Sequence, residues 1–419
     1  MSKAHLCSAL HKLVCLLILI GCSGDPSSVF DQVIDHFGGT GTFKQRYLYS
    51  DKFVNGKPQL VIVDIRGEGS EVEMGSLGLD VFNAGIKTKS IMVALEHRFY
   101  GKSRPLLNPT TKDLLKLLQT SQAVADLVTF REFIIKKYGL SHGVQFVLMG
   151  CSYAGSLAAW ARVKHPDLFL GAVASCPVID LRYDSPQYFL RVLGLLRDTN
   201  GRYMIQSNDP FCTSALCNIE KKCSFIFGSN TTTDQQALQV FNSIGNYIPR
   251  PDRLADYNQY ISRLKDKSEV SDVRFNQFQA CSQWALFRSC DSSNQCPFIR
   301  EPRPLEIDQA VCHDAFGLSE DDVRAKLAKE QKDFGGAGLN GTTNILVILG
   351  GMDPWNAAGR IGTSTHKGPI QMEVPLGSHC YWARPGATRL DGVKQILSQT
   401  LTTIQSWVKG NDPLPPVFI

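Results

Sequence analysis

Residues 144–155 read Val144-Gln145-Phe146-Val147-Leu148-Met149-Gly150-Cys151-Ser152-Tyr153-Ala154-Gly155, an apolar run that ends in a turn of small residues. The stretch that follows, residues 156–162, is helical in composition. A serine between small residues, where a strand turns into a helix, is typical of a nucleophile elbow, which lifts the hydroxyl out of the sheet. The N-terminus of the helix then offers backbone N–H groups to a developing oxyanion. Because most Gly-x-Ser sequences only cap helices, Ser152 is a candidate nucleophile that still needs an acid and a histidine.

Both partners follow later in the chain, at loop positions. Residues 344–349 form an apolar, strand-like run, after which Gly350-Gly351-Met352-Asp353-Pro354-Trp355 places an aspartate in a loop. A second short strand is predicted from residue 370, and the loop behind it carries His379. An isolated loop aspartate or histidine is usually a solvated surface residue, but these two follow strands in the chain order Ser, Asp, His of α/β-hydrolases. The predicted roles are attack on a carbonyl by Ser152, proton transfer by His379 and orientation of the imidazole by Asp353.

Length and composition fit a folded globular protein. The chain has 419 residues, of which 43% are hydrophobic and 20% charged, and this length allows one large domain or two. The net charge of +5 is mild, and no dense lysine and arginine tract is interleaved with aromatic residues. We therefore expect no nucleic-acid partner. Beyond the leader no apolar run approaches about 18 residues, so stable membrane insertion is not expected either.

The first 24 residues have the features of a targeting segment. Lys3 and Lys12 precede the apolar run 13–20, and the small residues of Gly21-Cys22-Ser23-Gly24 follow. A charged region, a short apolar region and a small-residue cleavage zone make up a signal peptide. The sequence therefore predicts export and removal of residues 1–24.

The route of export has two interpretations. Leu19-Ile20-Gly21-Cys22 resembles a bacterial lipoprotein cleavage box, which would leave the protein lipid-anchored through Cys22. Two acceptor tripeptides for N-glycosylation, at Asn230 and Asn340, favour a eukaryotic secretory route instead. Such tripeptides also arise by chance, so both interpretations stay open.

Cysteine usage favours disulfides over a metal site. Of 13 cysteines, ten remain once Cys7, Cys15 and Cys22 are set aside with the leader. Seven of the ten lie in one region: Cys212, Cys217, Cys223, Cys281, Cys290, Cys296 and Cys312. An even number in an exported protein indicates disulfides, whereas a zinc site is disfavoured because no Cys-x-x-Cys pair is present. We predict no metal, and the sequence does not define the disulfide connectivity.

Strands and helices alternate up to about residue 180. Residues 60–65, 90–95 and 171–175 are near-continuous apolar runs, as buried parallel strands should be. Between residues 112 and 138 apolar side chains recur at helical spacing, and Gly139 ends this predicted helix. The first part of the chain is therefore predicted to be an α/β sheet.

The pattern changes over residues 181–340, which are polar, cysteine-rich and helical in character. The sheet resumes near residue 344, and residues 392–409 form an amphipathic helix. The prediction is an α/β-hydrolase domain in two parts, 25–180 and 341–419, with a large helical, disulfide-rich cap inserted between them. Such a cap would restrict access to small or terminal substrate segments.

Several further motifs accompany the three candidate catalytic residues. They are Phe30-Asp31-Gln32-Val33-Ile34-Asp35-His36-Phe37, Gly67-Glu68-Gly69 in a glycine-rich loop, and Glu96-His97-Arg98-Phe99-Tyr100-Gly101-Lys102-Ser103. With them, the chain resembles the serine peptidase family of lysosomal prolylcarboxypeptidase, vesicular dipeptidyl peptidase and thymus-specific serine protease. The residues after Ser152 and the run Ser378-His379-Cys380 look closest to the thymus-specific branch. Asp35, His36 and His97 are interpreted as structural hydrogen-bonding groups.

The resemblance implies hydrolysis of short peptides near proline, without metal or cofactor. By analogy with the fold, the backbone N–H groups of Tyr153 and Gly67 would form the oxyanion hole. Glu68, Trp355 and Trp382 are the predicted substrate-binding residues, because aromatic faces suit a proline ring and a carboxylate suits an amine. Glu68 has the alternative of pairing with a core arginine. The two tryptophans have the alternative of packing in the core, and for Trp382 this alternative stands level with substrate binding. Peptides are the expected partners, the family suggests a homodimer, and the expected location is secreted or lysosomal.

The sequence departs from the family at two positions. Cys151 stands where the family usually has glycine before the nucleophile, and Arg66 replaces a glycine before Gly67. Cys151 has two interpretations: a small hydrophobic residue that packs into the core, or one half of a disulfide. Neither change removes a candidate catalytic residue.

Three classes of function therefore compete. The first is an exported serine exopeptidase that acts through an acyl-enzyme. The second is a carboxylesterase or lipase on the same fold, which the polar, cysteine-rich cap disfavours. The third is a non-catalytic binding protein, which the intact set of Ser152, Asp353 and His379 disfavours. The sequence leaves open whether a carboxypeptidase, a dipeptidyl peptidase or an endopeptidase results.

Overall fold

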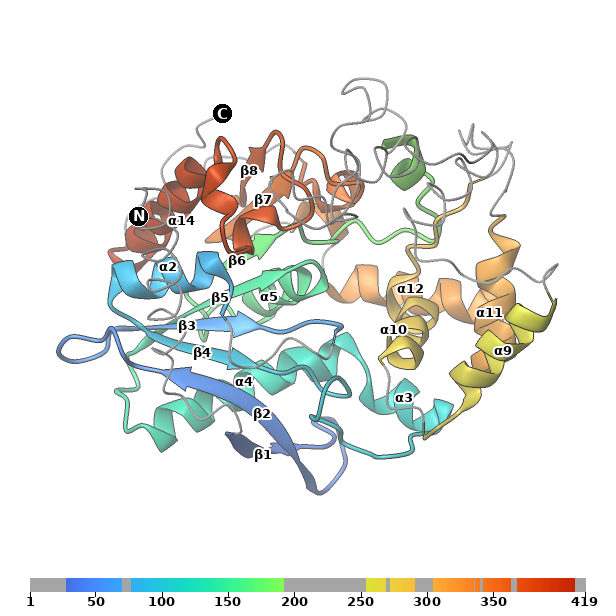
Figure 1. Cartoon of the computed structure of the whole chain (residues 1–419). Helices are drawn as coiled ribbons and strands as arrows, with labels where there is room; N and C mark the ends of the chain where they lie inside the picture. Colours follow the sequence, from blue (N-terminus) through green and yellow to red (C-terminus); the bar gives the residue numbers. More distant parts are fainter. Residues whose placement is uncertain are drawn as a thin grey trace, which may run out of the picture.

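One sheet of eight strands forms the centre of the molecule in the part of the chain that the structure describes (Figure 1). This computed structural model describes residues 28–69, 77–191, 254–268, 272–290, 304–334, 336–339, 342–362 and 368–410. The strands are β1 (Val29–Val33), β2 (Thr42–Ser50), β3 (Leu60–Ile65), β4 (Ile91–Leu95), β5 (Gln145–Cys151), β6 (Gly171–Ser175), β7 (Ile345–Gly350) and β8 (Ile370–Val374). Their order across the sheet is β1-β2-β4-β3-β5-β6-β7-β8.

The sheet is parallel except at one edge. β1 pairs with β2 and β2 pairs with β4 in antiparallel fashion, whereas all pairings from β4 across to β8 are parallel. The parallel strands β3, β4, β6 and β7 are buried along their whole length, which explains their unbroken apolar sequences. The loops that follow β3, β5, β7 and β8 therefore meet at the edge of the sheet that is formed by the carboxyl ends of the parallel strands.

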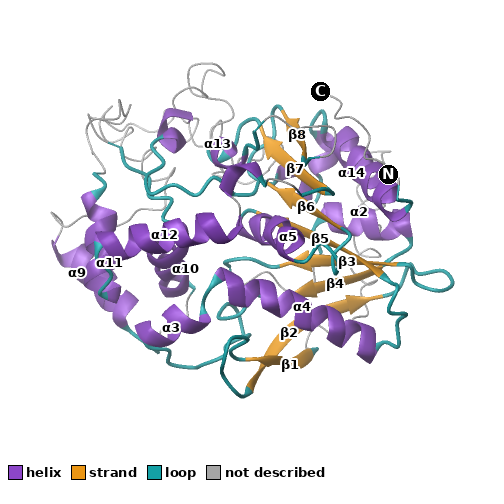
Figure 2. Cartoon of the chain, turned by 180° about the vertical axis from the view of Figure 1, so that it is seen from behind, coloured by secondary structure: helices purple, strands orange, loops and turns teal. Residues whose placement is uncertain are grey.

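Helices cover both faces of the sheet, because alternate side chains of each strand enter different cores. On β3, for example, Val61 belongs to one apolar cluster and its neighbour Ile62 to the other. One face is covered by α4 (Thr120–Lys137) and α5 (Tyr153–Lys164), and the other by α2 (Leu79–Thr88) and α14 (Val393–Val408) (Figure 2). The sheet is thus the middle of three layers.

The helix predicted over residues 112–138 is in fact two helices, α3 (Thr111–Leu117) and α4. At the break, the Leu118 carbonyl accepts a hydrogen bond of 2.7 Å from the Gln283 side-chain amide. The Thr120 hydroxyl donates to the oxygen of the same amide at 2.9 Å. A contact with a distant segment therefore interrupts a helix that the local apolar spacing would continue.

Two other helix ends follow the prediction. Gly139, with φ at +61°, lies just beyond the end of α4, where a residue without Cβ adopts the left-handed conformation at little cost. α14 begins directly after Gly392, also at positive φ, and ends within the predicted range.

A group of helices lies between β6 and β7 in the chain and packs beside the ends of the parallel strands (Figure 1). Its helices within the described ranges are α9 (Leu254–Lys265), α10 (Val273–Gln279), the π-helix η1 (Ala280–Trp284), α11 (Glu306–Phe316) and α12 (Glu320–Phe334). The Cys281–Cys312 disulfide joins η1 to α11, and Phe334 of α12 packs against Trp160 of α5 with ring centroids 5.1 Å apart. This is an α/β-hydrolase fold with a helical, disulfide-containing cap, so the predicted fold class is confirmed.

The remaining described elements are short: η3 (Gly336–Gly338), α13 (Asn356–Gly359), η4 (Tyr381–Ala383) and η5 (Ala387–Arg389). The proposed signal peptide at 1–24, Cys22 and the glycosylation sites Asn230 and Asn340 lie outside the described residues. The boundaries near residues 180 and 340 stay a prediction. Within the described ranges, no helix has the length and apolar character needed to cross a bilayer.

Candidate active site

Ser152 lies at the turn between β5 and α5. Its backbone has φ at 59° and ψ at −130°, a conformation that costs a non-glycine residue of order 1–3 kcal/mol. The Ser152 N–H donates to the Ser175 carbonyl on β6 at 2.9 Å, which holds the turn against the neighbouring strand. A strained serine at a strand-to-helix turn has the geometry of a nucleophile elbow.

The glycines around Ser152 leave no room for side chains. A Cβ on Gly150 would lie 2.3 Å from the Ala154 carbonyl oxygen, and a Cβ on Gly155 would lie 2.9 Å from the Ser175 carbonyl oxygen. Both neighbours are backbone atoms, so neither can turn aside as a side chain could. The small residues of the elbow are therefore a packing requirement of the turn.

We expect Gly150→Ala to lower the free energy of unfolding by about 1–3 kcal/mol, because the added methyl group collides with backbone. Urea denaturation measures the change. Gly143→Ala is the matched control, since a Cβ there would meet only the Ser141 Oγ, at 3.8 Å. Equal stability of the two variants would contradict the packing argument.

Asp353 and His379 meet at the same edge of the sheet. Asp353 follows β7 and His379 follows the adjacent strand β8. The His379 Nδ1 and the Asp353 Oδ2 lie 2.6 Å apart, and both side chains are buried. The other oxygen of Asp353 accepts the Trp355 backbone N–H at 2.9 Å. The carboxylate is thus held at both oxygens and orients the imidazole.

The second ring nitrogen of His379, Nε2, is buried and has no hydrogen-bond partner among the described residues. The structure therefore brings Asp353 and His379 into contact, and it places Ser152 at the same edge of the sheet without a Ser–His hydrogen bond. Hydrogen bonds of this kind often tighten only when substrate binds. Nε2 is the nitrogen that proton transfer from Ser152 would use.

The two predicted oxyanion donors flank Ser152. Tyr153 is the first residue of α5, so its backbone N–H has no acceptor within the helix. Gly67 follows β3, and a Cβ there would lie 3.3 Å from the Ala154 Cβ. The loop after β3 therefore runs against the start of α5. Binding of an oxyanion by these two groups stays a prediction.

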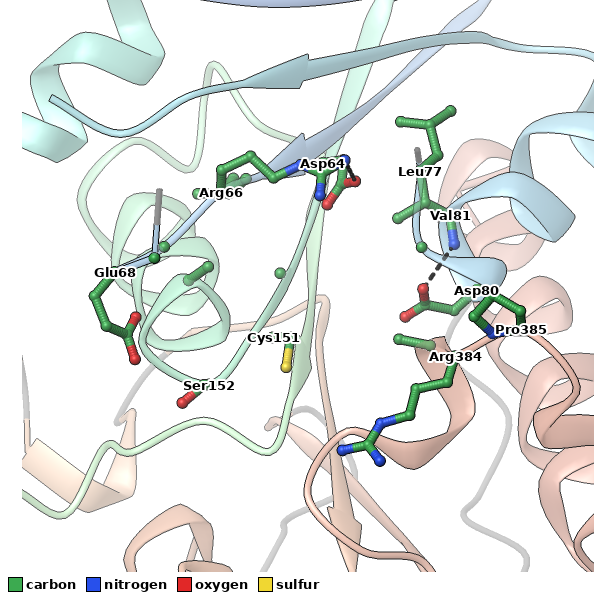
Figure 3. A pocket seen from close by; sticks show the side chains of 17 residues that line it. Asp64, Arg66, Glu68, Leu77, Asp80, Val81, Cys151, Ser152, Arg384 and Pro385 are labelled. Atoms are coloured by element: carbon green, nitrogen blue, oxygen red, sulfur yellow. Dashed lines mark hydrogen bonds and ion pairs between the residues drawn. The ribbon is translucent and has the colours of Figure 1, made fainter. Parts of the chain in front are cut away.

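Cavities open on two sides of Ser152. We call the first the Arg384 cavity; its volume is about 430 Å³. Its charged or reactive lining residues, labelled in Figure 3, are Asp64, Arg66, Glu68, Asp80, Cys151, Ser152 and Arg384. The second, the Trp355 cavity, has a volume of about 180 Å³ and is lined by aromatic and apolar side chains that include Trp160, Trp284, Leu181 and Trp355. Ser152 and Glu68 line both cavities.

Glu68 is the titratable side chain that the two cavities share. Burial raises its pKa from 4.5 to about 7, while its own backbone N–H and the nearby His379 act in the opposite direction. The side chain keeps some exposed surface, and Figure 3 shows its carboxylate on the side of Ser152. A charge beside Ser152 thus forms as the pH rises through neutrality.

This raised pKa gives a prediction for stability. Because the folded protein holds the Glu68 proton more tightly than the unfolded chain, whose pKa is 4.5, the free energy of unfolding falls as pH rises from about 4.5 to about 7. Glu68→Gln removes this pH dependence of the free energy of unfolding. The difference in Tm, variant minus wild type, should therefore increase from about pH 4.5 to about pH 7 and stay constant above that. Thermal unfolding from pH 4 to 8 tests this, with the exposed Glu132→Gln as control. A constant difference in Tm would contradict the assignment.

The two predicted tryptophans have different places. Trp355 lines the cavity named after it, where its ring packs against Tyr188 with centroids 4.8 Å apart and the Arg288 guanidinium lies 5.5 Å from its centroid. Trp382 is fully buried, and its Nε1 donates to the Ser175 Oγ at 2.9 Å. It lines neither cavity. For Trp382 the structure agrees with the core alternative and not with a substrate contact: η4 turns the ring into the core although the residue is close to His379 in sequence.

Two groups of described side chains have the proximity of metal ligands. In Cys151, His379 and Cys380 the donor atoms lie within 4.8 Å of one another, but both sulfurs belong to a disulfide. In Cys176, Asp353 and His379 the donors are equally close, but burial and the Asp353 charge raise the pKa of the Cys176 thiol well above its usual range. Metals bind the thiolate and not a disulfide sulfur, so the first group lacks two of its three ligands.

Sequence reasoning missed a buried link between the elbow and the cap. The His97 Nε2 lies 3.2 Å from the Tyr153 hydroxyl, and the Gln279 amide on α10 donates to that hydroxyl at 3.3 Å. Burial lowers the pKa of His97 to about 4, so the ring is neutral at physiological pH. His97 therefore has the structural role expected of it. No sequence signal marks Gln279, because glutamine on a helix is usually solvated.

The cavity residues from the cap and from the last loop were also missed. Trp284 and Arg288 line the Trp355 cavity, and Arg384 lines the larger one. Trp284 packs against Tyr153 with ring centroids 4.3 Å apart. These residues are remote from Ser152 in sequence, and no local motif connects them with it.

The sequence of this chain is similar to those of known serine peptidases. The family model described as serine carboxypeptidase S28 matches residues 32–204 and 199–391. Thymus-specific serine protease of Mus musculus is 26% identical over 457 residues, which cover 90% of this chain and 87% of the relative. Lysosomal Pro-X carboxypeptidase of Mus musculus is 34% identical over 157 residues, 36% of this chain and 32% of the relative.

Among solved structures, an esterase from Pyrobaculum calidifontis aligns with a TM-score of 0.41 and 13% identity, covering 97% of this chain and 94% of its own. The family assignment rests on the sequence match alone. Since that match spans most of the chain and includes Ser152 and His379, the protein belongs to the serine carboxypeptidase S28 family.

Proposed function

We propose that this protein is an exported serine exopeptidase that cleaves short peptides near proline. The observation that carries the proposal is the buried Asp353–His379 hydrogen bond of 2.6 Å at the sheet edge where the strained Ser152 lies. In a member of a serine peptidase family, this arrangement supports Ser-His-Asp acyl transfer. The assignment of all three roles is part of the proposal.

The mechanism follows from the positions of these side chains. The Ser152 Oγ attacks the scissile carbonyl while the His379 Nε2 takes its proton, and Asp353 stabilises the imidazolium through Nδ1. The backbone N–H groups of Tyr153 and Gly67 donate hydrogen bonds to the carbonyl oxygen as negative charge develops on it. His379 then protonates the leaving amine. In the second half of the reaction water attacks the acyl carbon while His379 takes its proton, and His379 returns a proton to the Ser152 Oγ as the acid product leaves.

The Trp355 cavity supports a preference for proline. Its volume of about 180 Å³ and its lining of Trp160, Trp284 and Trp355 suit a small, flat, apolar ring. A proline ring loses little conformational entropy on binding, because its φ is already fixed. The Pro-X carboxypeptidase among the relatives bears a name that agrees with this preference.

Charged groups beside Ser152 support cleavage close to a peptide terminus. Glu68 and Arg384 both line the Arg384 cavity, so a carboxylate and a guanidinium border the space that a peptide terminus would enter. The cap helices pack beside the strand ends, and we infer that they limit the length of peptide that can enter.

A secreted or lysosomal location is proposed from the leader sequence and from the lysosomal relative.

Product analysis by mass spectrometry tests the proposal. Purified wild-type protein is incubated with proline-containing peptides that are free or blocked at either end. Loss of one C-terminal residue would define a carboxypeptidase, and release of N-terminal dipeptides would define a dipeptidyl peptidase. Cleavage of peptides blocked at both ends would contradict the exopeptidase assignment. Hydrolysis of simple esters without any peptide cleavage would favour the esterase alternative.

A further inference from the structure

The Cys151–Cys380 disulfide joins the two segments that carry Ser152 and His379. Cys151 is the last residue of β5 and directly precedes Ser152, and Cys380 directly follows His379. The Cα atoms of the two cysteines lie 6.1 Å apart, across a sequence separation of 229 residues. A ring nitrogen of His379 lies within 4.8 Å of both sulfurs. One covalent bond therefore connects the immediate neighbours of the proposed nucleophile and the proposed base.

The hydrogen bonds around these two segments run to the end of β6. The Ser152 N–H donates to the Ser175 carbonyl at 2.9 Å, and the Cys380 N–H donates to the Cys176 Sγ at 3.1 Å. Each segment is thus held to β6 separately. The His379 Nε2 has no hydrogen bond within the described residues, so the disulfide is a direct tie between the elbow and the histidine loop.

We propose that the Cys151–Cys380 disulfide positions His379 against Ser152, so that catalysis depends on the oxidation state of this bond. The inference rests on the proposed function of Ser152 and His379. Proton transfer requires the two side chains to approach within hydrogen-bond distance, and a misplacement of about 1 Å can cost about 10²-fold in rate. With the bond intact, the histidine loop is tied covalently to the elbow; after reduction, the loop keeps its contacts with β6 and the Asp353–His379 hydrogen bond, but no bond joins it directly to the elbow.

The site offers a path for reduction. Cys151 is half-buried and lines the Arg384 cavity (Figure 3), whereas Cys380 is buried. The thiolate of a dithiol reductant attacks the Cys151 Sγ, the S–S bond breaks, and the Cys380 sulfur leaves and takes a proton. The second thiol of the reductant then closes an intramolecular disulfide and releases Cys151 as a thiol. Two electrons and two protons pass to the protein, and the dithiol becomes a cyclic disulfide.

Cys176 does not compete with this reductant. Its sulfur contacts the Cys380 N–H, yet the side chain is buried and carries a free thiol. Burial and Asp353 raise its pKa, and a protonated thiol is a poor nucleophile toward a disulfide. The Cys151–Cys380 bond therefore persists beside a third sulfur.

The test measures Ser152 reactivity and peptide cleavage in the oxidised and reduced protein. Wild type is titrated with dithiothreitol, and alkylation with mass spectrometry reports the state of Cys151 and Cys380. We expect kcat, and the rate of Ser152 labelling by a fluorophosphonate, to fall about 10- to 100-fold as this bond is reduced, with KM changed less than about 2-fold. Reoxidation should restore both rates.

Two variants separate positioning from folding. The double variant C151A/C380A should be labelled at the low rate of the reduced wild type both with and without dithiothreitol. Circular dichroism should report an intact fold. The matched control C281A/C312A removes the cap disulfide and should keep the response to dithiothreitol. A loss of the response in the control would overturn the assignment to the Cys151–Cys380 bond.

The readouts keep this inference distinct from the proposed function. Equal labelling rates in oxidised and reduced protein would overturn the inference even if peptides are cleaved. Faster labelling of the oxidised protein without cleavage of any peptide would support the inference and contradict the peptidase assignment. Absence of labelling in the oxidised wild type would overturn both, because no reactive Ser–His pair would then exist.

Discussion

Ser152→Ala should reduce kcat/KM for a cleaved peptide by about 10⁶-fold, because removal of the nucleophile disables the whole Ser-His-Asp unit. KM should change little, since both cavities keep their other lining residues. Steady-state kinetics on the best substrate of the product screen give both parameters. Residual cleavage above about one per cent of wild type would contradict the role of Ser152.

Ser152→Gly provides a second, independent readout of the same residue. It should be as inactive as Ser152→Ala, but more stable than the alanine variant by about 1 kcal/mol, since glycine accepts φ at 59° without strain. Chemical denaturation of the two variants gives the difference. A less stable glycine variant would mean that the elbow stores no strain at this residue.

Asp353→Asn should lower kcat by about 10⁴-fold with little change in KM. The asparagine amide would donate to the His379 Nδ1, in place of the 2.6 Å contact with the carboxylate. The proton of the ring would then sit on Nε2, where it blocks acceptance of the Ser152 proton. Asp353 lines neither cavity, so substrate binding should survive.

The control for this variant is Asp180→Asn. Asp180 forms an ion pair with the exposed Arg182 at 2.5 Å. It should keep the wild-type kcat. Similar losses in the two variants would show that the Asp353 effect is not specific to the imidazole.

The sequence predicted those parts of the fold that local patterns encode. Apolar runs identified the buried strands 60–65 and 171–175, and small residues marked the turn at Ser152. Gly139 marked the end of α4. In each case the feature depends on residues a few positions apart in the sequence, or on the burial of the strand itself.

Features that depend on contacts between segments far apart in the sequence were not predicted. The break at Leu118 arises because Gln283 of the cap bonds to its carbonyl. For Trp382, close to His379 in sequence, the pattern leaves substrate binding and core packing open, and the hydrogen bond to Ser175 holds it in the core. For Cys151 the two interpretations stayed open until the fold brought Cys380 beside it. A sequence pattern contains no distances between segments, so these contacts become visible only in three dimensions.

The position of β7 and β8 in the chain has a consequence for biosynthesis. A growing chain that has reached residue 340 contains β1 to β6 and Ser152, but neither Asp353 nor His379. Folding during synthesis proceeds from the N-terminus, so the nascent protein holds a serine hydroxyl with no base to activate it. Under the roles proposed for these residues, β7 and β8 must join the sheet beside β6 before Ser152 can attack a substrate. The order of the strands thereby keeps Ser152 without its proposed base until β8 and the loop behind it have been made.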